Sequence, residues 1–402
     1  TEILRNTLFN KKINTKNTET KPIELQFDLD IETELGAVVF DEVHYIGDAD
    51  RGSVWEQSIL LLPPQVQLIM LSATIEKPHI FAEWLETEKN KGLELSEKKQ
   101  LYMTTTYERV VPLTHYLWTS CAPSVIQSHK GTPMEYKLRE VINKPLQVAS
   151  SGGTFNDANY YKTSKILDYF FKNKITSKRQ YILNDLVQYL NRNDVLPAIC
   201  FIFSRKNVEI AAKEITHTLF DKDDKTPSII EHECEKILMS KLKNYREYTM
   251  LDEYRSIITL LKKGIAIHHA GIMPILREMV ELLFEKRYIK LLFATETFAV
   301  GVNKPVKTVI FKQLDKFDNN GKRFLRSDEY TQMAGRAGRR GKDTEGTVIF
   351  LPLKNMLKAD EFKNMLTGSA VSIQSKLILN TKYLFQLLIL FLIFIFYHHI
   401  FL

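Results

Sequence analysis

Two adjacent carboxylates, Asp41 and Glu42, come directly after the apolar run 37–40, which is typical of a buried strand. At a strand end, one carboxylate of such a pair can hold Mg²⁺ through water while the other orients and deprotonates an attacking water molecule. The alternative is a pair of surface acids after a strand, because Asp-Glu dipeptides are common. His44, two positions further on, favours the catalytic interpretation.

A second cluster, near the other end of the chain, supplies positive charge. It contains Gln332, Arg336 and Arg339 within the segment 332–341. On a helix, Arg336 and Arg339 would share a face, where two guanidinium groups can clamp the γ-phosphate of a nucleotide. Gln332 lies four residues before Arg336 and can reach the same site. A Gly- and Arg-rich turn that binds nucleic acid is the alternative.

The loop that would hold the triphosphate, G-x-x-x-x-G-K-[ST], occurs nowhere in the 402 residues. The sequence also starts at Thr1 without a methionine. We therefore expect a fragment of an ATP-driven enzyme. By itself, the fragment is expected to bind ATP poorly and to hydrolyse it negligibly.

Composition is ordinary for a soluble globular protein, with 44% hydrophobic and 26% charged residues, and the net charge of +7 suits a polyanionic partner. Cys121, Cys200 and Cys234 lie far apart without C-x-x-C spacing, so neither a disulfide framework nor a zinc site is expected. The segment 387–402 is almost entirely apolar. A buried helix or translation past a splice boundary is favoured there over a membrane anchor.

Short apolar runs alternate with helical patterns such as 208–219 and 276–285, which predicts parallel α/β sheets. The polar motifs lie just beyond these runs, where open α/β sheets bind their ligands. The predicted strands are 37–40, 67–71, 199–203, 265–268, 290–294, 307–311 and 347–351.

Hydroxyl groups follow two of these strands. Ser72 and Thr74 come after the second strand, where a helix N-cap is the alternative role. Thr295 and Thr297 come after the fifth strand and can bind phosphates, although an ordinary strand-to-helix loop would have the same residues.

Adjacent histidines follow the fourth strand, at His268 and His269. Neighbouring side chains point in different directions on a helix or a strand, so a two-histidine metal site is not expected. The segment from His268 to Gly271 is interpreted as a turn that touches backbone phosphate, or as the site of a buried structural histidine.

A hairpin is predicted in the segment 312–327, because Asn320-Gly321 is a preferred type I′ turn. Phe317 and Phe324 flank this turn. The hairpin could separate nucleic-acid strands, or it could be a surface hairpin with a cross-strand aromatic pair. Its basic residues are Lys322, Arg323 and Arg326.

Taken in order, these motifs resemble those of the superkiller-like DExH-box RNA helicases, the exosome-associated clade of superfamily 2. The segments 111–117 and 275–284 favour this clade over DNA-directed relatives. The resemblance covers most of the chain from Thr1 to about Gln386. The matching segments are 1–6, 41–44, 72–74, 203–205, 268–271, 295–303 and 332–339.

The resemblance implies an α/β fold of two RecA-like lobes that close on ATP and on single-stranded RNA, with 3′-to-5′ translocation. Asp41 would hold Mg²⁺ and Glu42 would be the base, while Gly301 would lie near the ribose. The residues that would contact ATP phosphates are Gln332, Arg336 and Arg339. Those that would contact RNA are Arg5, Ser204, Arg205, His269, Gly271, Thr295 and Thr297. Those that would couple hydrolysis to lobe movement are His44, Ser72 and Thr74.

The expected domains are a first lobe incomplete at its N-terminus (1–120), a linker or insertion (121–195), a second lobe (196–355), the start of a winged-helix region (356–386) and the apolar tail (387–402). The expected ligands are ATP, Mg²⁺ and RNA with a single-stranded 3′ overhang. The resemblance also suggests exosome or adaptor proteins as partners, in the nucleus or the cytoplasm. Two alternatives remain: a DNA-directed helicase of the same superfamily, and a non-catalytic nucleic-acid-binding remnant.

Overall fold

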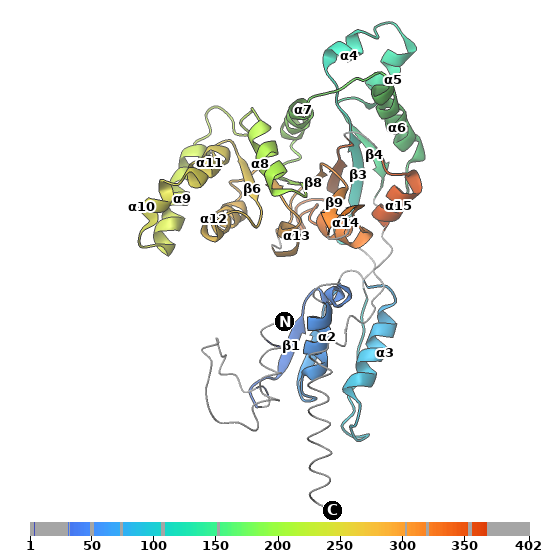
Figure 1. Ribbon diagram of the computed structural model, residues 1–402, viewed down its shortest axis with the longest axis vertical. Coiled ribbons are helices and arrows are strands. Elements are labelled where there is room, and N and C mark those ends of the chain that lie inside the picture. The colour runs from blue at the N-terminus through green and yellow to red at the C-terminus, as the bar shows by residue number, and fades with distance from the viewer. Residues whose placement is uncertain are drawn as a thin grey trace, which may run out of the picture. The chain divides into compact units, whose positions relative to one another are not determined.

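The computed structural model describes residues 4, 31, 33–48, 52–72, 75–105, 109–150, 153–301, 304–318, 321–352 and 356–367 (Figure 1). The backbone contacts divide the chain into two compact units. The boundary between them lies at Thr106/Tyr107, and the second unit extends to Ser369. Each unit is a mixture of helices and mostly parallel strands, as predicted from the sequence.

The described part of unit 1 is built around one pair of parallel strands. Strand β1 (Ala37–Phe40) pairs with β2 (Gln67–Met70) along its whole length. The helices are η2 (Val43–Gly47), α2 (Gly52–Leu61) and α3 (Pro78–Lys89). Apolar side chains of the strands, the helices and the turns between them form a small core. It includes Phe40, Val43, Ile46, Ile59, Leu62, Val66 and Leu85.

Unit 2 contains a seven-stranded sheet in the order β4-β3-β11-β8-β5-β7-β6. All pairings are parallel except the antiparallel pairing of β3 with β4 at one edge. Every residue of the four strands β5, β6, β7 and β8 is buried, which explains why they are continuous apolar runs in the sequence. The strands are β3 (Leu113–Trp118), β4 (Pro145–Ala149), β5 (Ala198–Phe201), β6 (Ile265–His268), β7 (Leu291–Ala294), β8 (Thr308–Phe311) and β11 (Gly346–Phe350).

Helices cover this sheet: α8, α11 and α12 contact its edge strand β6, and α9 packs against α11 and α12 (Figure 1). Helix α12 shows why: Leu276, Met279, Val280 and Leu283 recur at helical spacing, and all four are fully buried. The helices are α4 (Pro123–Gln127), α5 (Pro133–Val141), α6 (Asp157–Lys172), α7 (Arg179–Arg192), α8 (Arg205–Glu214), α9 (Thr226–Lys241), α10 (Tyr245–Thr249), α11 (Asp252–Leu261), α12 (Pro274–Glu285), α13 (Thr297–Gly301), α14 (Ser327–Ala334) and α15 (Ala359–Thr367).

The predicted domain boundaries differ from those of the structure. Strand β3 lies before residue 120, yet it pairs with β11, with His115 opposite Val348, and so belongs to unit 2. The expected linker 121–195 supplies β4 of the same sheet as well as α4 to α7. An apolar run shows that a strand exists, but not which sheet it joins, because the partner strand is more than 200 residues away.

The end of unit 2 also lies further along the chain than the predicted boundary at residue 355. Helix α15 packs into the same core, with Phe362 contacting the rings of Phe155, Tyr160 and Phe350. The expected winged-helix start is thus described only up to residue 367 and belongs to unit 2 there. The predicted apolar tail 387–402 lies outside the described residues. Among the helices that are described, none has the length and apolar character needed to span a bilayer.

Candidate functional site

The acidic motif of unit 1 lies at the ends of β1 and β2. Glu42 has a left-handed backbone (φ 57°), and its N–H donates to the Asp41 Oδ1 at 2.9 Å. A non-glycine residue at positive φ costs roughly 1–2 kcal/mol, and such residues occur often at functional sites. At this sharp turn Asp41 is exposed and Glu42 is half-buried.

His44 brings the two predicted motifs of unit 1 together. Its Nδ1 lies 3.2 Å from the Oγ of Ser72 and 3.3 Å from the Oε2 of Glu42. Backbone bonds support this contact, since the N–H of Val43 donates to the carbonyl of Leu71 at 2.9 Å. The predicted coupling residues His44 and Ser72 are therefore neighbours, whereas Thr74 lies outside the described residues.

The carboxylates suit a hard cation. Asp41 and Glu42 offer oxygen donors at a partly exposed turn, as expected for Mg²⁺ that is held mostly by water and phosphate oxygens. In the part of the chain that the structure describes, no group of three or more His, Cys, Asp or Glu side chains is arranged to hold a metal ion. The residues thus fit a nucleotide-bound Mg²⁺ better than an all-protein metal cage.

The predicted RNA-contacting residues of unit 2 follow the carboxyl ends of three neighbouring strands, β5, β7 and β6, and we call this end of the sheet the RNA edge. The last residues of three neighbouring strands, Phe201, Ala294 and His268, are directly opposite one another. The connections stay paired beyond the strands, where the N–H of Ile202 donates to the Ala294 carbonyl at 2.9 Å and that of Thr295 to the His268 carbonyl at 3.1 Å. Segments 93 positions apart in the sequence, those after Phe201 and Ala294, therefore begin their turns side by side.

Arg205, His269 and Gly271 form a tight group at this edge. A Cβ on Gly271 would lie 3.1 Å from the His269 Nδ1 and 3.3 Å from the Arg205 Cδ, so a larger residue would displace both side chains. The N–H of Gly271 donates to the His269 Nδ1 at 3.1 Å. Ser204, beside Arg205, accepts at 3.4 Å from the N–H of Asn207 and so caps α8.

The two adjacent histidines have different partners, in agreement with the predicted divergence of their side chains. The Nε2 of His268 lies 2.7 Å from the Oε1 of Glu281, and its ring packs against Phe298. The Nε2 of His269 lies 3.3 Å from the Oε1 of Glu209. Burial lowers the pKa of both histidines, so that both rings are neutral at physiological pH.

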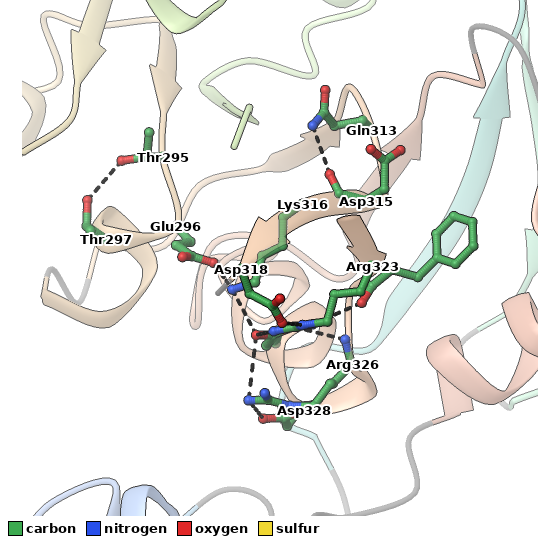
Figure 2. Close-up of polar contacts among 12 residues, drawn as sticks. Thr295, Glu296, Thr297, Gln313, Asp315, Lys316, Asp318, Arg323, Arg326 and Asp328 are labelled. Atoms are coloured by element: carbon green, nitrogen blue, oxygen red, sulfur yellow. Dashed lines mark hydrogen bonds and ion pairs between the residues drawn. The ribbon is translucent and has the colours of Figure 1, made fainter. Parts of the chain in front are cut away.

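The hydroxyl groups of Thr295 and Thr297 lie 2.9 Å apart at the start of α13 (Figure 2). Between them, Glu296 projects toward Lys316, and the Oε2 of Glu296 lies 2.5 Å from the Lys316 Nζ. Gly301, which the resemblance places near the ribose, is the last residue of α13. Of the predicted RNA-contacting residues, Arg5 alone lies outside the described ranges.

The arginine motif departs from the predicted geometry. Helix α14 contains Gln332 but ends at Ala334, so Arg336 and Arg339 do not share a helical face. Arg336 donates through its Nη2 to the carbonyl of Ala299, at the middle of α13. Residues 335–341, which we name the motif VI arginine loop after the sixth helicase motif that the resemblance implies here, therefore contact α13, the helix that begins at Thr297.

Arg339 is held by a carboxylate that sequence reasoning missed. Its Nε and Nη2 donate to the two oxygens of Asp343, each at 2.7 Å, and its backbone N–H donates to Oδ2 at 2.9 Å. The hydrogen bonds from Arg339 lower the pKa of Asp343, and those from Asp343 raise the pKa of Arg339. Asp343 follows Arg339 by four positions, and this spacing of opposite charges is the sequence pattern that could have predicted the pair.

Arg109 is a second residue that sequence reasoning missed. Its Nη2 donates to the carbonyls of Gly335 at 2.7 Å and Ala337 at 2.9 Å, and its Nε donates to that of Val111 at 2.7 Å. Burial lowers the pKa of this guanidinium. No local pattern predicts these contacts, because they join segments more than 220 residues apart.

Two family models match the chain. The model of the DEAD/DEAH box helicase matches residues 18–80, and that of the helicase conserved C-terminal domain matches residues 221–341. The first covers the acidic motif, and the second covers the Thr295 segment and the motif VI arginine loop.

Curated relatives align with most of the chain. Antiviral helicase SKI2 of Saccharomyces cerevisiae is 34% identical over 387 residues, which cover 87% of this chain and 29% of SKI2. Superkiller complex protein 2 of Homo sapiens is 35% identical, with 89% of this chain and 28% of the relative covered. Exosome RNA helicase MTR4 of Homo sapiens is 34% identical, with 85% and 30% covered. The chain thus spans less than a third of the length of these relatives.

Proposed function

Because the chain belongs to the superkiller-type DExH-box RNA helicases, we propose that it couples ATP hydrolysis to 3′-to-5′ movement along RNA and to RNA unwinding. The proposed setting is RNA processing or decay. One observation carries this proposal: the predicted RNA-contacting residues converge at the RNA edge, the carboxyl ends of β5, β7 and β6. These residues are Ser204, Arg205, His269, Gly271, Thr295 and Thr297.

In the proposed RNA contact, this edge binds the sugar-phosphate backbone of a single strand. Hydroxyl groups, backbone N–H groups and a helix N-terminus are the usual partners of phosphate oxygens. Ser204, the N-cap of α8, offers a hydroxyl group at a helix N-terminus, and Thr297, the first residue of α13, offers a second hydroxyl group. Arg205 adds a positive charge beside them.

In the proposed ATP chemistry, Asp41 holds Mg²⁺ and Glu42 takes the proton of the attacking water. Bound Mg²⁺ neutralises charge on the phosphates. Arg336 and Arg339 stabilise the charge that develops on the transferring phosphate. Gln332 is proposed to contact the same phosphates, and Gly301 to lie near the ribose. The contact between His44 and Ser72 is proposed to transmit the state of the nucleotide to the turn after β2.

The proposal is tested by measuring ATP hydrolysis, with and without single-stranded RNA, on the protein translated from the complete native transcript. We expect turnover that RNA stimulates and that Glu42→Gln abolishes. RNA binding without turnover would instead favour the non-catalytic interpretation. A DNA strand of the same sequence is the control for substrate type, and equal stimulation by DNA would contradict a preference for RNA.

The partners and the place of action are proposed from the relatives. The names of two relatives mention the exosome and the superkiller complex, so exosome or adaptor proteins are the proposed partners. The nucleus and the cytoplasm are both compatible with this role. Affinity purification of the native protein followed by mass spectrometry tests this proposal, and the absence of exosome subunits would contradict it.

A further inference from the structure

The predicted hairpin forms and has two chemically different faces. Strands β9 (Asp315–Asp318) and β10 (Gly321–Phe324) are antiparallel. Residues directly opposite each other share a face, so Lys316 and Arg323 lie on one face. Phe317, opposite Lys322, lies on the other face with Phe324, opposite Asp315. The two phenylalanines are therefore diagonal neighbours across the hairpin.

The face with the phenylalanines is open to solvent. Phe317 is 78% exposed and Phe324 is 51% exposed, which is unusual for phenylalanine side chains. Lys322 on the same face is 3.1 Å from Asp315, and its side chain is 59% exposed. This face thus offers two rings and one paired cation.

The opposite face is fixed by a group of four side chains, which we name the Glu329 clamp: Glu296, Lys316, Arg323 and Glu329. The Nζ of Lys316 lies 2.5 Å from the Oε2 of Glu296 and 2.9 Å from the Oε1 of Glu329. Arg323 donates to both oxygens of Glu329, each at 2.8 Å. Figure 2 shows Lys316 and Arg323 on the same side of the hairpin, with Glu296 beyond Lys316.

Glu329 is the shared acceptor of the clamp. It receives one cation from each strand of the hairpin, and it also accepts at 2.9 Å from the backbone N–H of Arg326, at the start of α14. Burial by itself would raise the pKa of Glu329, but the hydrogen bonds from Arg323 and Lys316 lower it to about 2. The carboxylate is therefore ionised at physiological pH and ties the hairpin to the helix that contains Gln332.

The two arginines among the predicted basic residues of the hairpin form ion pairs within the protein. Arg323 is bound to Glu329 and, at 2.6 Å, to Asp318, while Arg326 is bound to Asp328 at 3.0 Å. These two arginines are therefore paired with carboxylates of the protein itself. What the hairpin presents outward is aromatic surface, which suits nucleobases better than phosphates.

We propose that Glu329 and Lys316 are positioning residues that hold the hairpin in a fixed orientation relative to the Thr295–Thr297 segment. In that orientation Phe317 and Phe324 stack on the bases of a single RNA strand whose backbone lies along the segment. The inference rests on the proposed RNA binding. It predicts that the hairpin contributes to affinity by stacking and not by counterion release, because its cations are already paired within the protein.

The test is the affinity of the 402-residue chain for a fluorescent single-stranded oligouridine, measured by anisotropy over a range of salt concentrations. Phe317→Ala should weaken binding by about tenfold, the scale of one base–aromatic stack, without changing the slope of log K against log salt. An abasic strand with the same backbone should bind the variant and the parent equally.

The clamp is tested with Glu329→Gln alone and combined with Phe317→Ala. If Glu329 acts by orienting Phe317 and Phe324, the two losses will not multiply, and Glu329→Gln will cost less affinity in the Phe317→Ala background, where only the Phe324 stack remains. A general structural effect would multiply with Phe317→Ala. Lys316→Met, which breaks the same link from the other side, is the second variant if Glu329→Gln fails to fold by circular dichroism.

Glu135→Gln is the matched control, because Glu135 is another carboxylate that binds both an arginine, Arg139, and a backbone N–H. It should leave RNA affinity unchanged. Multiplying losses for Glu329→Gln and Phe317→Ala, or an unchanged affinity of Phe317→Ala, would overturn the inference while RNA binding by the parent chain is retained. Failure of the parent chain to bind RNA would instead refute the proposed function.

Discussion

The Nη2 of Arg109 lies 2.7 Å from the carbonyl oxygen of Gly335, although 226 positions separate the two residues. Arg109 is among the first described residues of unit 2, and Gly335 opens the motif VI arginine loop. The guanidinium of Arg109 therefore ties the start of this unit to the loop that contains Arg336 and Arg339. Val111, two residues after Arg109, also lies close to Gly338 of this loop.

We expect Arg109→Met to loosen the loop selectively. The substitution leaves three carbonyl acceptors without their charged donor, and a hydrogen bond to a charged group contributes about 1.5–3 kcal/mol. Hydrogen–deuterium exchange should become faster at the amides of residues 335–341 and stay unchanged in β5 and β7. Arg139→Met, which removes an exposed ion pair with Glu135, is the control and should change neither region. Uniformly faster exchange throughout unit 2 would contradict a local role.

Gly338→Ala should destabilise unit 2 by about 2–4 kcal/mol, because it combines two costs. The backbone is left-handed (φ +86°), and a Cβ would lie 2.4 Å from the Cγ1 of Val111. Gly341→Ala is a matched control, since Gly341 is also left-handed (φ +73°) but a Cβ there would have no other atom within 4 Å. Urea denaturation measures both variants. Equal losses would show that the contact with Val111 adds nothing.

The stability of unit 2 should fall as the pH is lowered from about 6.5 to 4 through the buried His115. Burial, followed by the charge of Arg109, lowers the pKa of His115 to about 4, and its Nδ1 lies 2.8 Å from the Tyr330 hydroxyl. The folded pKa lies below the unfolded one, so the unfolded chain takes up the proton first. Full stability is present above pH 6.5, and about 3 kcal/mol is lost by pH 4, at 1.36 kcal/mol per pKa unit.

Urea denaturation at several pH values, compared between the parent chain and His115→Gln, isolates this contribution. Glutamine does not titrate, so the parent should lose more stability than the variant across this range. Parallel pH profiles would mean that His115 does not contribute to the acid sensitivity.

We expect that replacing Glu42 can stabilise unit 1 even though the proposed function needs its carboxylate. Its left-handed backbone is unfavourable for glutamate, whereas asparagine tolerates this conformation better. We expect Glu42→Asn to stabilise unit 1 by about 0.5 kcal/mol and Glu42→Val, which is β-branched, to destabilise it by about 1 kcal/mol or more. In differential scanning calorimetry, the unfolding temperature of unit 1 should thus be highest for Glu42→Asn, lower for the parent chain and lowest for Glu42→Val. The reverse order would argue against backbone strain at this position.

Much of the fold was predictable because its strands are local patterns. The runs 37–40 and 265–268 match β1 and β6 residue for residue. All four residues of β6 are buried, as a run of apolar residues predicts, whereas only Phe40 is buried in β1. The placement of β3 was not predictable in the same way. Its six residues resemble any other strand, and its membership of unit 2 depends on pairing with β11 at the far end of the chain.

The candidate site shows the same division. The sequence predicts the residue types that can do chemistry, among them Asp41, Glu42, Arg336 and Arg339, because carboxylates can hold Mg²⁺ and guanidinium groups can bind phosphate. It also determined the family, since those motifs follow one another in order. The resemblance could not show which of the charged residues remain available to a ligand.

Only the tertiary structure decided how those charges are used. It pairs Arg323 with Glu329 and Arg339 with Asp343, and it adds Arg109 to the motif VI arginine loop. Hydrogen bonds and ion pairs act over a few ångströms in space, and the fold alone decides which distant residues come within that range. The sequence therefore predicted the chemistry that we propose, and the packing of the second unit decided which of its charged groups are paired within the protein.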